Sequence, residues 1–224
     1  RLHITEAEDE QQQVLLRSLA APASDLDVAQ LALVQAIRSK YRIAQEPLNA
    51  IVLEVFDLSS RANLDPTLIL AVIGVASNYN PFAKSPLGAQ GLMQIMPNTG
   101  RWIAKKLGQG EFKTEDLHDM KTNIRFGTFY LKSVSDDLDG SQAMASAAYN
   151  AGPNRPRAWR ATLPGPVEGA IFAEIIPFSE TRDYVKKVLS NAVYYALLQK
   201  QENSSLKKRL GEITPKTASQ SLLP

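Results

Sequence analysis

The stretch LDPTLILAVIGVASNYNP, residues 64–81, decides the fold of this chain. An Asp-Pro pair, Asp65 and Pro66, is a typical helix start, and the residues after it are apolar on nearly every side of the helix that follows. A helix that is apolar all round is buried inside a domain and does not lie on its surface. We therefore expect a central helix that ends near Ala76 and Ser77 and runs into a turn.

Apolar residues at helical spacing recur on both sides of this stretch. No segment shows the period-two alternation of a strand over a useful length, so the sequence predicts a mainly α fold. We expect Pro47 to open one helix and Ser179 to act as the N-cap of the last one. The other helices are expected over residues 28–43, 98–108, 121–138, 141–150 and 179–201.

The remaining segments are expected to be irregular. Proline and glycine interrupt residues 81–100 and 152–169, which we interpret as loops. We expect three parts along the chain: an N-terminal helical extension in residues 1–45, the main domain in residues 46–201, and a polar, loosely held tail in residues 202–224. The basic run SLKKRLG in this tail is interpreted as a solvated helix end, with contact to an anionic wall polymer as the alternative.

The composition excludes several classes of protein. The 224 residues contain no cysteine, which excludes disulfides, thiolate metal sites and cysteine nucleophiles. A net charge of +2, carried by scattered basic residues, does not indicate a nucleic-acid partner. No apolar run reaches the roughly 18 residues of a transmembrane segment. The chain begins at Arg1 without an apolar leader, so we expect a processed or trimmed chain.

Two further blocks carry polar side chains among glycines. In SPLGAQGLMQIMPNT, residues 85–99, the glycines suit the wall of a ligand groove, but the block equally suits a loop packed on the core. In AAYNAGPNRPRAW, residues 147–159, the Tyr-Asn pair is either a sugar-binding feature or a helix stop. Taken one at a time, the blocks leave these alternatives open.

Taken together and in order, these pieces resemble the catalytic domain of the soluble lytic transglycosylases. These are bacterial enzymes with a goose-type lysozyme-like fold that cleave peptidoglycan. The resemblance rests on the central helix, the GLMQ and AYNAGP blocks and the segment IPFSETRDYVKKVL, and it covers residues 47–201. It implies a mainly α, lysozyme-like domain that carries an N-terminal helical extension.

The resemblance also implies a set of site residues around a glycan groove. The family's catalytic glutamate falls on Ala76, which is the one departure in these motifs that affects the chemistry. Tyr79, next to this position, is a candidate groove aromatic. The full set of expected substrate-binding residues is Ser77, Tyr79, Ser85, Gln94, Met96, Tyr149, Asn150, Glu180, Arg182 and Tyr184.

In the mechanism that the resemblance implies, one glutamate does both proton transfers. It protonates the oxygen between muramic acid and glucosamine, and then takes the proton of the C6 hydroxyl, which closes onto C1 to give a 1,6-anhydro sugar. Burial at the end of an apolar helix would raise the pKa of such an acid. Alanine can neither give nor take a proton, so we expect this chain to be inactive or very slow.

Several alternatives stay open. Glu180 is the only carboxylate left in the motifs, and it either takes over the acid's role or anchors the groove by pairing with Arg182 or a backbone N–H. Two alternatives to a disabled transglycosylase also stay open: a non-catalytic peptidoglycan-binding scaffold, and a muramidase that uses water. Ala76 is a deliberate substitution or the mark of a natural pseudoenzyme, and the intact motifs favour the first.

The resemblance implies peptidoglycan glycan strands as the partner, with no nucleic acid, and a periplasmic or exported location. We expect a monomer without a transmembrane segment. His3 and His118 lack ligand partners at suitable spacing, so no metal and no cofactor are expected. Trp102 and Trp159 are interpreted as buried helix anchors, with sugar stacking as the alternative.

Overall fold

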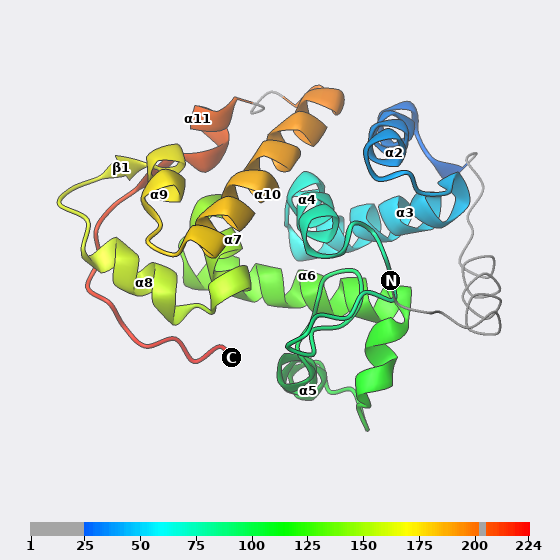
Figure 1. Cartoon of the computed structure of the whole chain (residues 1–224), viewed down its shortest axis with the longest axis horizontal. Coiled ribbons are helices and arrows are strands. Elements are labelled where there is room, and N and C mark those ends of the chain that lie inside the picture. Colours follow the sequence, from blue (N-terminus) through cyan, green and yellow to red (C-terminus); the bar gives the residue numbers. More distant parts are fainter. Residues whose placement is uncertain (1–24, 202–204) are drawn as a thin grey trace.

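The computed structural model describes residues 25–201 and 205–224, and this part of the chain is mainly helical, as expected (Figure 1). The two short strands, β1 and β2, pair antiparallel with Val167 opposite Ile213. The elements in chain order are α2 (Val28–Tyr41), α3 (Gln45–Ala62), α4 (Pro66–Ser77), α5 (Pro97–Lys106), the 3-10 helix η2 (Thr114–His118), α6 (Met120–Asp137), α7 (Gln142–Ala151), α8 (Asn154–Ala161), β1 (Val167–Glu168), α9 (Gly169–Ile175), α10 (Ser179–Leu198), α11 (Leu206–Leu210) and β2 (Glu212–Ile213).

Helix α4 is the buried centre that its sequence predicts. The Asp65 carboxylate caps its start by accepting hydrogen bonds from the Thr67 amide (2.9 Å) and the Thr67 hydroxyl (2.7 Å). Every residue from Thr67 to Gly74 is buried. The helix ends at Asn78, whose backbone adopts the left-handed conformation (φ 52°) and whose N–H bonds the Gly74 carbonyl.

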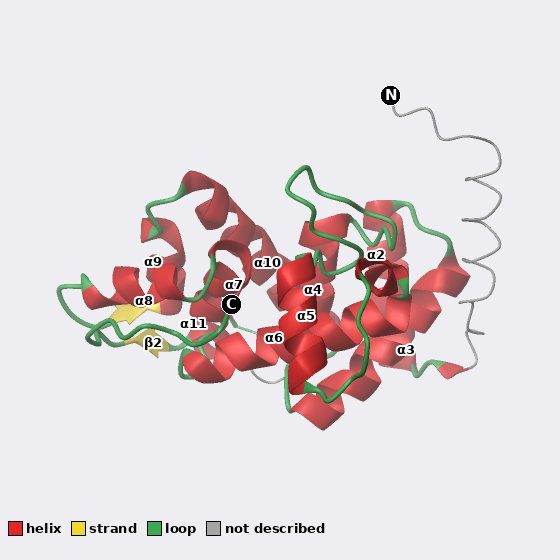
Figure 2. Cartoon of the chain, turned by 90° about the horizontal axis from the view of Figure 1, so that it is seen from below, coloured by secondary structure: helices red, strands yellow, loops and turns green. Residues whose placement is uncertain are grey.

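The other helices enclose α4 in a way that leaves its C-terminal end near the surface. Helix α10 packs along α4 and also against α7, while α3 packs against both α4 and α6. Figure 2 shows α2 and α3 at one end of the molecule and α8, α9, α11 and the strands at the other, with α4 and α6 between them. The core is thus one continuous cluster of apolar side chains.

Prolines account for two errors in the predicted helices. Helix α3 begins at Gln45, two residues before Pro47, and residues 152–169 are not one loop because they contain α8. Pro47 and Pro156 each occupy the third position of their helix, where a backbone N–H has no intrahelical acceptor and proline is tolerated. A third detail is also wrong, because Ser179 is the first helical residue of α10 and Phe178 is its N-cap, without a side-chain bond.

The C-terminal tail is packed against the domain, which corrects the expectation of a loose tail. The side chain of Arg209 is buried in an ion pair with the Asp65 carboxylate that caps α4, so the SLKKRLG run is not simply a solvated helix end. Farther on, the Tyr130 hydroxyl donates to the Pro224 carbonyl (2.5 Å), and strand β2 pairs with β1. These polar contacts join segments that are far apart in sequence, so no local sequence pattern predicts them.

Candidate active site

Ala76 lies at the end of α4, one residue before the last residue of the helix, and is partly exposed. The neighbouring Ser77 is buried, and its hydroxyl donates to the Ile73 carbonyl (3.0 Å) within the same helix. Ser77 therefore closes the last helical turn, and its hydroxyl is not directed at a groove in this structure. Ala76 itself presents only a methyl group at this end of the helix.

Tyr79 packs in the core, which differs from the expected role of an exposed groove aromatic. It is 3% exposed, its hydroxyl donates to the Leu70 carbonyl (2.8 Å), and its ring meets Tyr41 edge-on at 5.1 Å. Burial raises the pKa of its hydroxyl well above the ordinary value. The backbone of Tyr79 has a positive φ of 62°, which is uncommon for a residue other than glycine. Its hydrogen bond to Leu70 therefore anchors the turn that follows α4.

The loop after α4 is fixed by Asn123, a residue that the sequence did not single out. Its buried side chain accepts a hydrogen bond from the Met93 amide (2.8 Å) and donates to the carbonyls of Gln90 (2.9 Å) and Leu117 (2.8 Å). Gly91 permits this close approach, because a Cβ there would lie 2.2 Å from the Asn123 amide nitrogen. A lone asparagine on an amphipathic helix gives no sequence signal for such a role.

Two of the predicted groove residues in this loop hold its backbone. The Ser85 hydroxyl accepts a hydrogen bond from the Ala89 amide (3.0 Å). The Gln94 side-chain amide donates to the carbonyls of Ala83 (3.0 Å) and Gly91 (2.9 Å), which supports its own left-handed backbone (φ 50°). Met96, at the far end of the loop, is 41% exposed and offers its side chain to the surface.

Tyr149 and Asn150 connect this loop to α10. The Tyr149 hydroxyl donates to the Met93 carbonyl (2.7 Å), and Asn150 accepts a hydrogen bond from the Thr181 hydroxyl (2.8 Å). Burial, with smaller effects of the neighbouring tyrosines, raises the pKa of Tyr149 well above its ordinary value. The Tyr-Asn pair therefore does more than stop α7, because it joins the loop, α7 and α10.

The motif at the start of α10 supplies three different side chains. Glu180 is exposed and makes no hydrogen bond or ion pair with the described residues, so the expected pair with Arg182 does not form. Arg182 donates to the Ile176 carbonyl (3.0 Å). Tyr184 buries its hydroxyl without a partner in the described part of the chain, and this burial raises its pKa.

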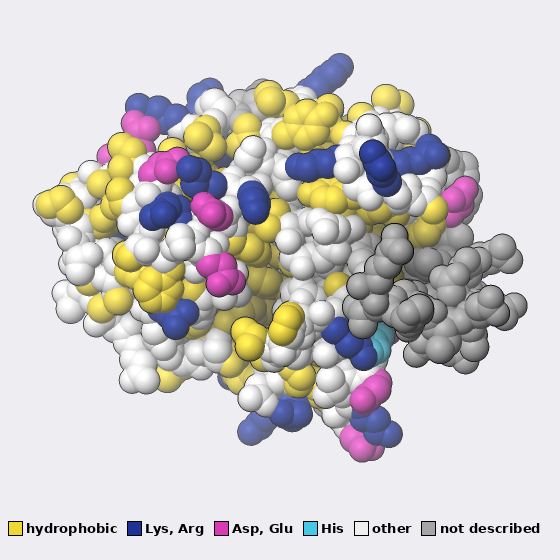
Figure 3. All heavy atoms as spheres, viewed as in Figure 1, with side chains coloured by type: hydrophobic (Ala, Val, Ile, Leu, Met, Phe, Trp, Pro, Cys, Tyr) yellow, Lys and Arg dark blue, Asp and Glu magenta, His cyan; other side chains and the backbone are white. Residues whose placement is uncertain are grey.

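These segments border a hollow that Figure 3 shows between the part of the molecule with α8 to α10 and the part with α5. Within residues 25–201 and 205–224, no group of acidic and histidine side chains is arranged to hold a metal ion. His118 bonds the Gln90 side chain (2.8 Å), and its burial lowers its pKa. His3 lies outside the described residues. No helix of the described part is long and apolar enough to cross a membrane.

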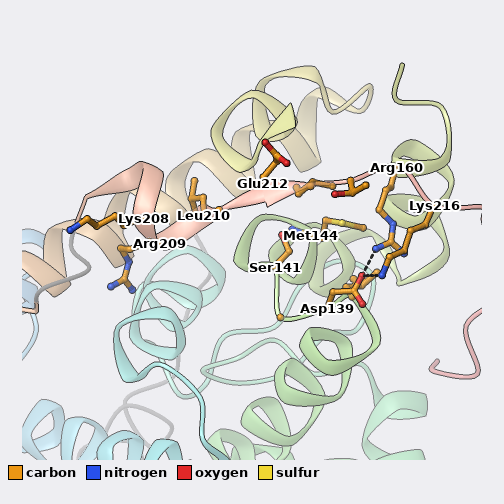
Figure 4. Close-up of a pocket in the computed structure, with 14 residues that line it drawn as sticks. Asp139, Ser141, Met144, Arg160, Lys208, Arg209, Leu210, Glu212 and Lys216 are labelled. Carbon is orange, nitrogen blue, oxygen red and sulfur yellow. Dashed lines mark hydrogen bonds and ion pairs between the residues drawn. The ribbon is translucent and has the colours of Figure 1, made fainter. Parts of the chain in front are cut away.

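A separate pocket of about 440 Å³ lies between the tail and the turn from α6 to α7, and contains none of the predicted site residues. Figure 4 shows Arg160 and Lys216 converging on the Asp139 carboxylate, at 2.7 and 2.5 Å. The single carboxylate of Asp139 thus pairs with two cations, and its contact with Lys216 ties the tail down. Trp102 and Trp159 are partly buried and pack against the core, as expected for helix anchors.

Two ranges of this chain match known protein families. Residues 55–165 match the family described as the transglycosylase SLT domain, and residues 175–204 match the soluble lytic transglycosylase helical domain. The chain belongs to the soluble lytic transglycosylase family. Together the two matched ranges contain Ala76 and all the predicted site residues.

Individual members of the family agree with this assignment. The soluble lytic murein transglycosylase of Escherichia coli K12 is 42% identical over 138 residues, which are 61% of this chain and 21% of that protein. A putative soluble lytic murein transglycosylase of Haemophilus influenzae is 35% identical over 147 residues, 64% of this chain and 24% of the relative. This chain thus spans less than a quarter of these relatives' length.

Solved structures of the family share the lysozyme-like helical fold. An inactive Glu-to-Gln mutant of the lytic transglycosylase Slt from Pseudomonas aeruginosa has a TM-score of 0.62 at 34% identity, covering 75% of this chain and 29% of that one. The complex of a 70-kDa soluble lytic transglycosylase with bulgecin A has a TM-score of 0.64 at 31% identity, covering 93% of this chain and 32% of the other.

Proposed function

We propose that this domain binds the glycan strands of peptidoglycan in the hollow around Ala76 and turns them over very slowly or not at all. The observation that carries the proposal is the alanine at residue 76, the position that the resemblance assigns to the acid, in a chain similar to a murein transglycosylase. The surrounding motif residues keep their hydrogen bonds, which supports a groove that retains its shape.

The proposed reaction of the restored enzyme needs a single carboxyl group. The acid gives its proton to the glycosidic oxygen between muramic acid and glucosamine, and the bond from that oxygen to C1 breaks. The carboxylate then takes the proton of the C6 hydroxyl while its oxygen bonds to C1, which closes the 1,6-anhydro ring and consumes no water. Losing a general acid or base alone lowers a rate about 10²- to 10⁴-fold, and here both proton transfers are lost.

The unpartnered hydroxyl of Tyr184 supports this proposal. A buried polar group without a partner is costly, and a bound ligand or a restored carboxylate would satisfy it. We therefore place Tyr184 among the groups that contact substrate. Ser85, Gln94, Tyr149 and Arg182 are proposed to shape the groove through the backbone bonds described above, with Met96 and Asn150 at its surface.

The exposure of Glu180 favours one competing function. Because this carboxylate has no partner among the described residues, it is free to act on a bound sugar. A chain that uses Glu180 would be catalytic without a residue change, either as a transglycosylase or as a muramidase that delivers water. The other competitor is a scaffold that binds glycan and stays inactive even when the acid is restored.

One experiment separates these functions. The unaltered chain, Ala76→Glu, Glu180→Gln and the double variant are each incubated with purified peptidoglycan, and the released muropeptides are identified by mass spectrometry. We expect products with 1,6-anhydromuramic acid from Ala76→Glu alone or with Glu180→Gln, and none from the unaltered chain. Turnover by the unaltered chain that Glu180→Gln abolishes would contradict the proposal, and reducing-end products would indicate a muramidase.

A periplasmic or exported location follows from the proposed substrate, which lies outside the inner membrane. We also propose that residues 46–201 are the catalytic unit and that the domain acts as a monomer. The described parts of the flanking segments, 25–45 and 205–224, pack directly on this unit.

A further inference from the structure

A basic cleft lies beside the candidate site, where α2, α4 and α10 meet. Its volume is about 620 Å³. Its lining includes three lysines and no acidic residue, and it is open to the surface. The lining residues are Lys40, Tyr41, Gly74, Val75, Asn78, Lys186, Lys187, Ser190 and Asn191.

The charges of this cleft are largely uncompensated. The Lys40 ammonium donates to the Asn191 side-chain carbonyl (2.7 Å), a neutral partner that orients the charge without cancelling it. Lys187 is exposed and has no ion pair with the described residues. Lys186 is paired with Glu174 at 2.8 Å. Lys40 and Lys187 therefore leave two positive charges without an ion pair among the described residues. Such charges at the edge of a concave surface attract an anion more strongly than the same charges on a flat surface.

The cleft is held open by fixed contacts. Asn191 is buried and bonds the Tyr41 hydroxyl (3.2 Å) with its amide nitrogen, so one side chain positions both Tyr41 and Lys40. Gly74 allows α2 to approach α4 here, because a Cβ on it would lie 2.6 Å from the Tyr41 hydroxyl. Helix α2 therefore contributes one wall and one charge of a preformed cleft.

The cleft adjoins the candidate site through two of its three helices, α4 and α10. On α4, Val75 and Asn78 line it and flank Ala76 in sequence. On α10, Lys187 follows Glu180 by seven residues and Tyr184 by three, so all three lie on one face of the helix. Figure 1 shows α2, α4 and α10 together, and Figure 3 shows Lys and Arg side chains gathered over this region.

We propose that this cleft binds carboxylate groups of the peptides that branch from the glycan strand, with Lys40 and Lys187 as the residues that contact them. The inference rests on the proposed function, because it places the peptide of the same substrate next to the groove that holds its sugars. It gives α2 a role in substrate recognition. An anionic, flexible branch fits an open, positively charged cleft. The sugar strand gains little from the cleft, because the carboxyl group of each muramic acid is used in the amide bond to the peptide and carries no charge.

Binding to the unaltered chain tests the inference without turnover. Isothermal titration calorimetry compares two murein oligosaccharides of equal length, one with its peptides and one in which a neutral methylamide replaces the peptide on each muramic acid carboxyl group. We expect the double variant Lys40→Gln, Lys187→Gln to bind the peptide-bearing oligosaccharide roughly fivefold more weakly and the peptide-free one unchanged. Lys187→Arg, which keeps the charge, and Lys121→Gln, an exposed lysine outside the cleft, are expected to bind as the unaltered chain does.

Three other results would each overturn the inference. Unchanged binding of the peptide-bearing oligosaccharide by the double variant would overturn the inference and leave the proposed function intact. An equal loss for both oligosaccharides would show that the cleft holds sugar, which also overturns it. If the unaltered chain binds neither oligosaccharide, the proposed function fails and the inference fails with it.

Discussion

The hydroxyl of Tyr149 donates a hydrogen bond to the backbone carbonyl of Met93 at 2.7 Å, and this bond joins α7 to the loop that follows α4. Met93 is fully buried, and Tyr149 is partly buried beside it. Tyr149 also packs against Tyr130, with ring centroids 5.6 Å apart, so its ring is held from a second side. The position of the loop relative to α7 therefore depends on a contact between a motif side chain and the loop backbone.

Removing this hydroxyl is expected to destabilise the domain. Tyr149→Phe keeps the ring and leaves the Met93 carbonyl without its donor, which should lower the free energy of unfolding by about 1 kcal/mol. Urea unfolding measures the change. Tyr194→Phe, at a half-exposed tyrosine on α10, is the control and should change little. Equal stability of the Tyr149→Phe variant and the parent would mean that the bond does not hold the loop on α7.

Asn123 is expected to be more important for stability than any of the predicted groove residues. Asn123→Ala removes three buried hydrogen bonds to the loop and to the segment before α6, so we expect a loss of roughly 3 kcal/mol in unfolding free energy. Asn98→Ala, at an exposed position of α5, provides the comparison. A loss as small as that of Asn98→Ala would mean that Asn123 does not fix the loop after α4.

Gly91 is expected to reject a side chain for two reasons. Its backbone has a positive φ of 74°, and an added Cβ would collide with Asn123 and with the Leu117 carbonyl. We expect Gly91→Ala to lower the melting temperature clearly in a thermal scan, because neither the backbone nor a buried amide can move aside. Gly110→Ala has open space and should be close to neutral. A neutral Gly91→Ala would show that the loop can repack.

The tail contacts predict a dependence of stability on pH. The hydrogen bond from Lys216, together with Arg160, holds the pKa of Asp139 below its ordinary value. A lowered carboxyl pKa stabilises the fold above the unfolded value near pH 4, and this contribution is lost as the pH falls through the folded value. Asp139→Asn should therefore lower the free energy of unfolding by less than about 1 kcal/mol near neutral pH, since the Asp139 side chain is 57% exposed.

Melting temperatures measured from about pH 6 to about pH 2 test this expectation. The difference between the parent and Asp139→Asn should shrink toward the acid end of the series. Glu111→Gln, at an exposed residue with no ion pair to the described residues, should give no such trend. A constant difference across the series would show that the Asp139 charge does not hold the tail.

The helices were predictable because their signals are local. Asp65, Pro66 and the apolar residues that follow suffice to predict α4, and burial of the whole helix confirms it. Helix α8 was missed because Pro156 is typical of a loop unless it is known to lie in a first turn. The packing of the tail on the domain was not predicted, because the ion pair between Arg209 and Asp65 joins residues that are far apart in sequence.

For the candidate site, the sequence predicted which segments meet and predicted fewer of the contacts between them. The motifs led to the loop, α7 and α10, which the structure brings together through Tyr149 and Asn150. The sequence could not show that Tyr79 is buried or that Glu180 lacks the expected pair with Arg182. It also held no signal for Asn123, since an asparagine inside a helix has no characteristic neighbours in sequence.

The position of Ala76 near the C-terminal end of α4 sets function against stability. A carboxylate there would face the negative end of the helix dipole and would be partly removed from water, and both effects disfavour its charged form. The same effects that would keep a catalytic acid protonated would weaken the fold at neutral pH, while alanine favours the helix and carries no charge. Under the proposed function, the present chain lies on the stable side of a trade-off, and we expect the Ala76→Glu variant to melt at a lower temperature while it gains the proposed catalysis.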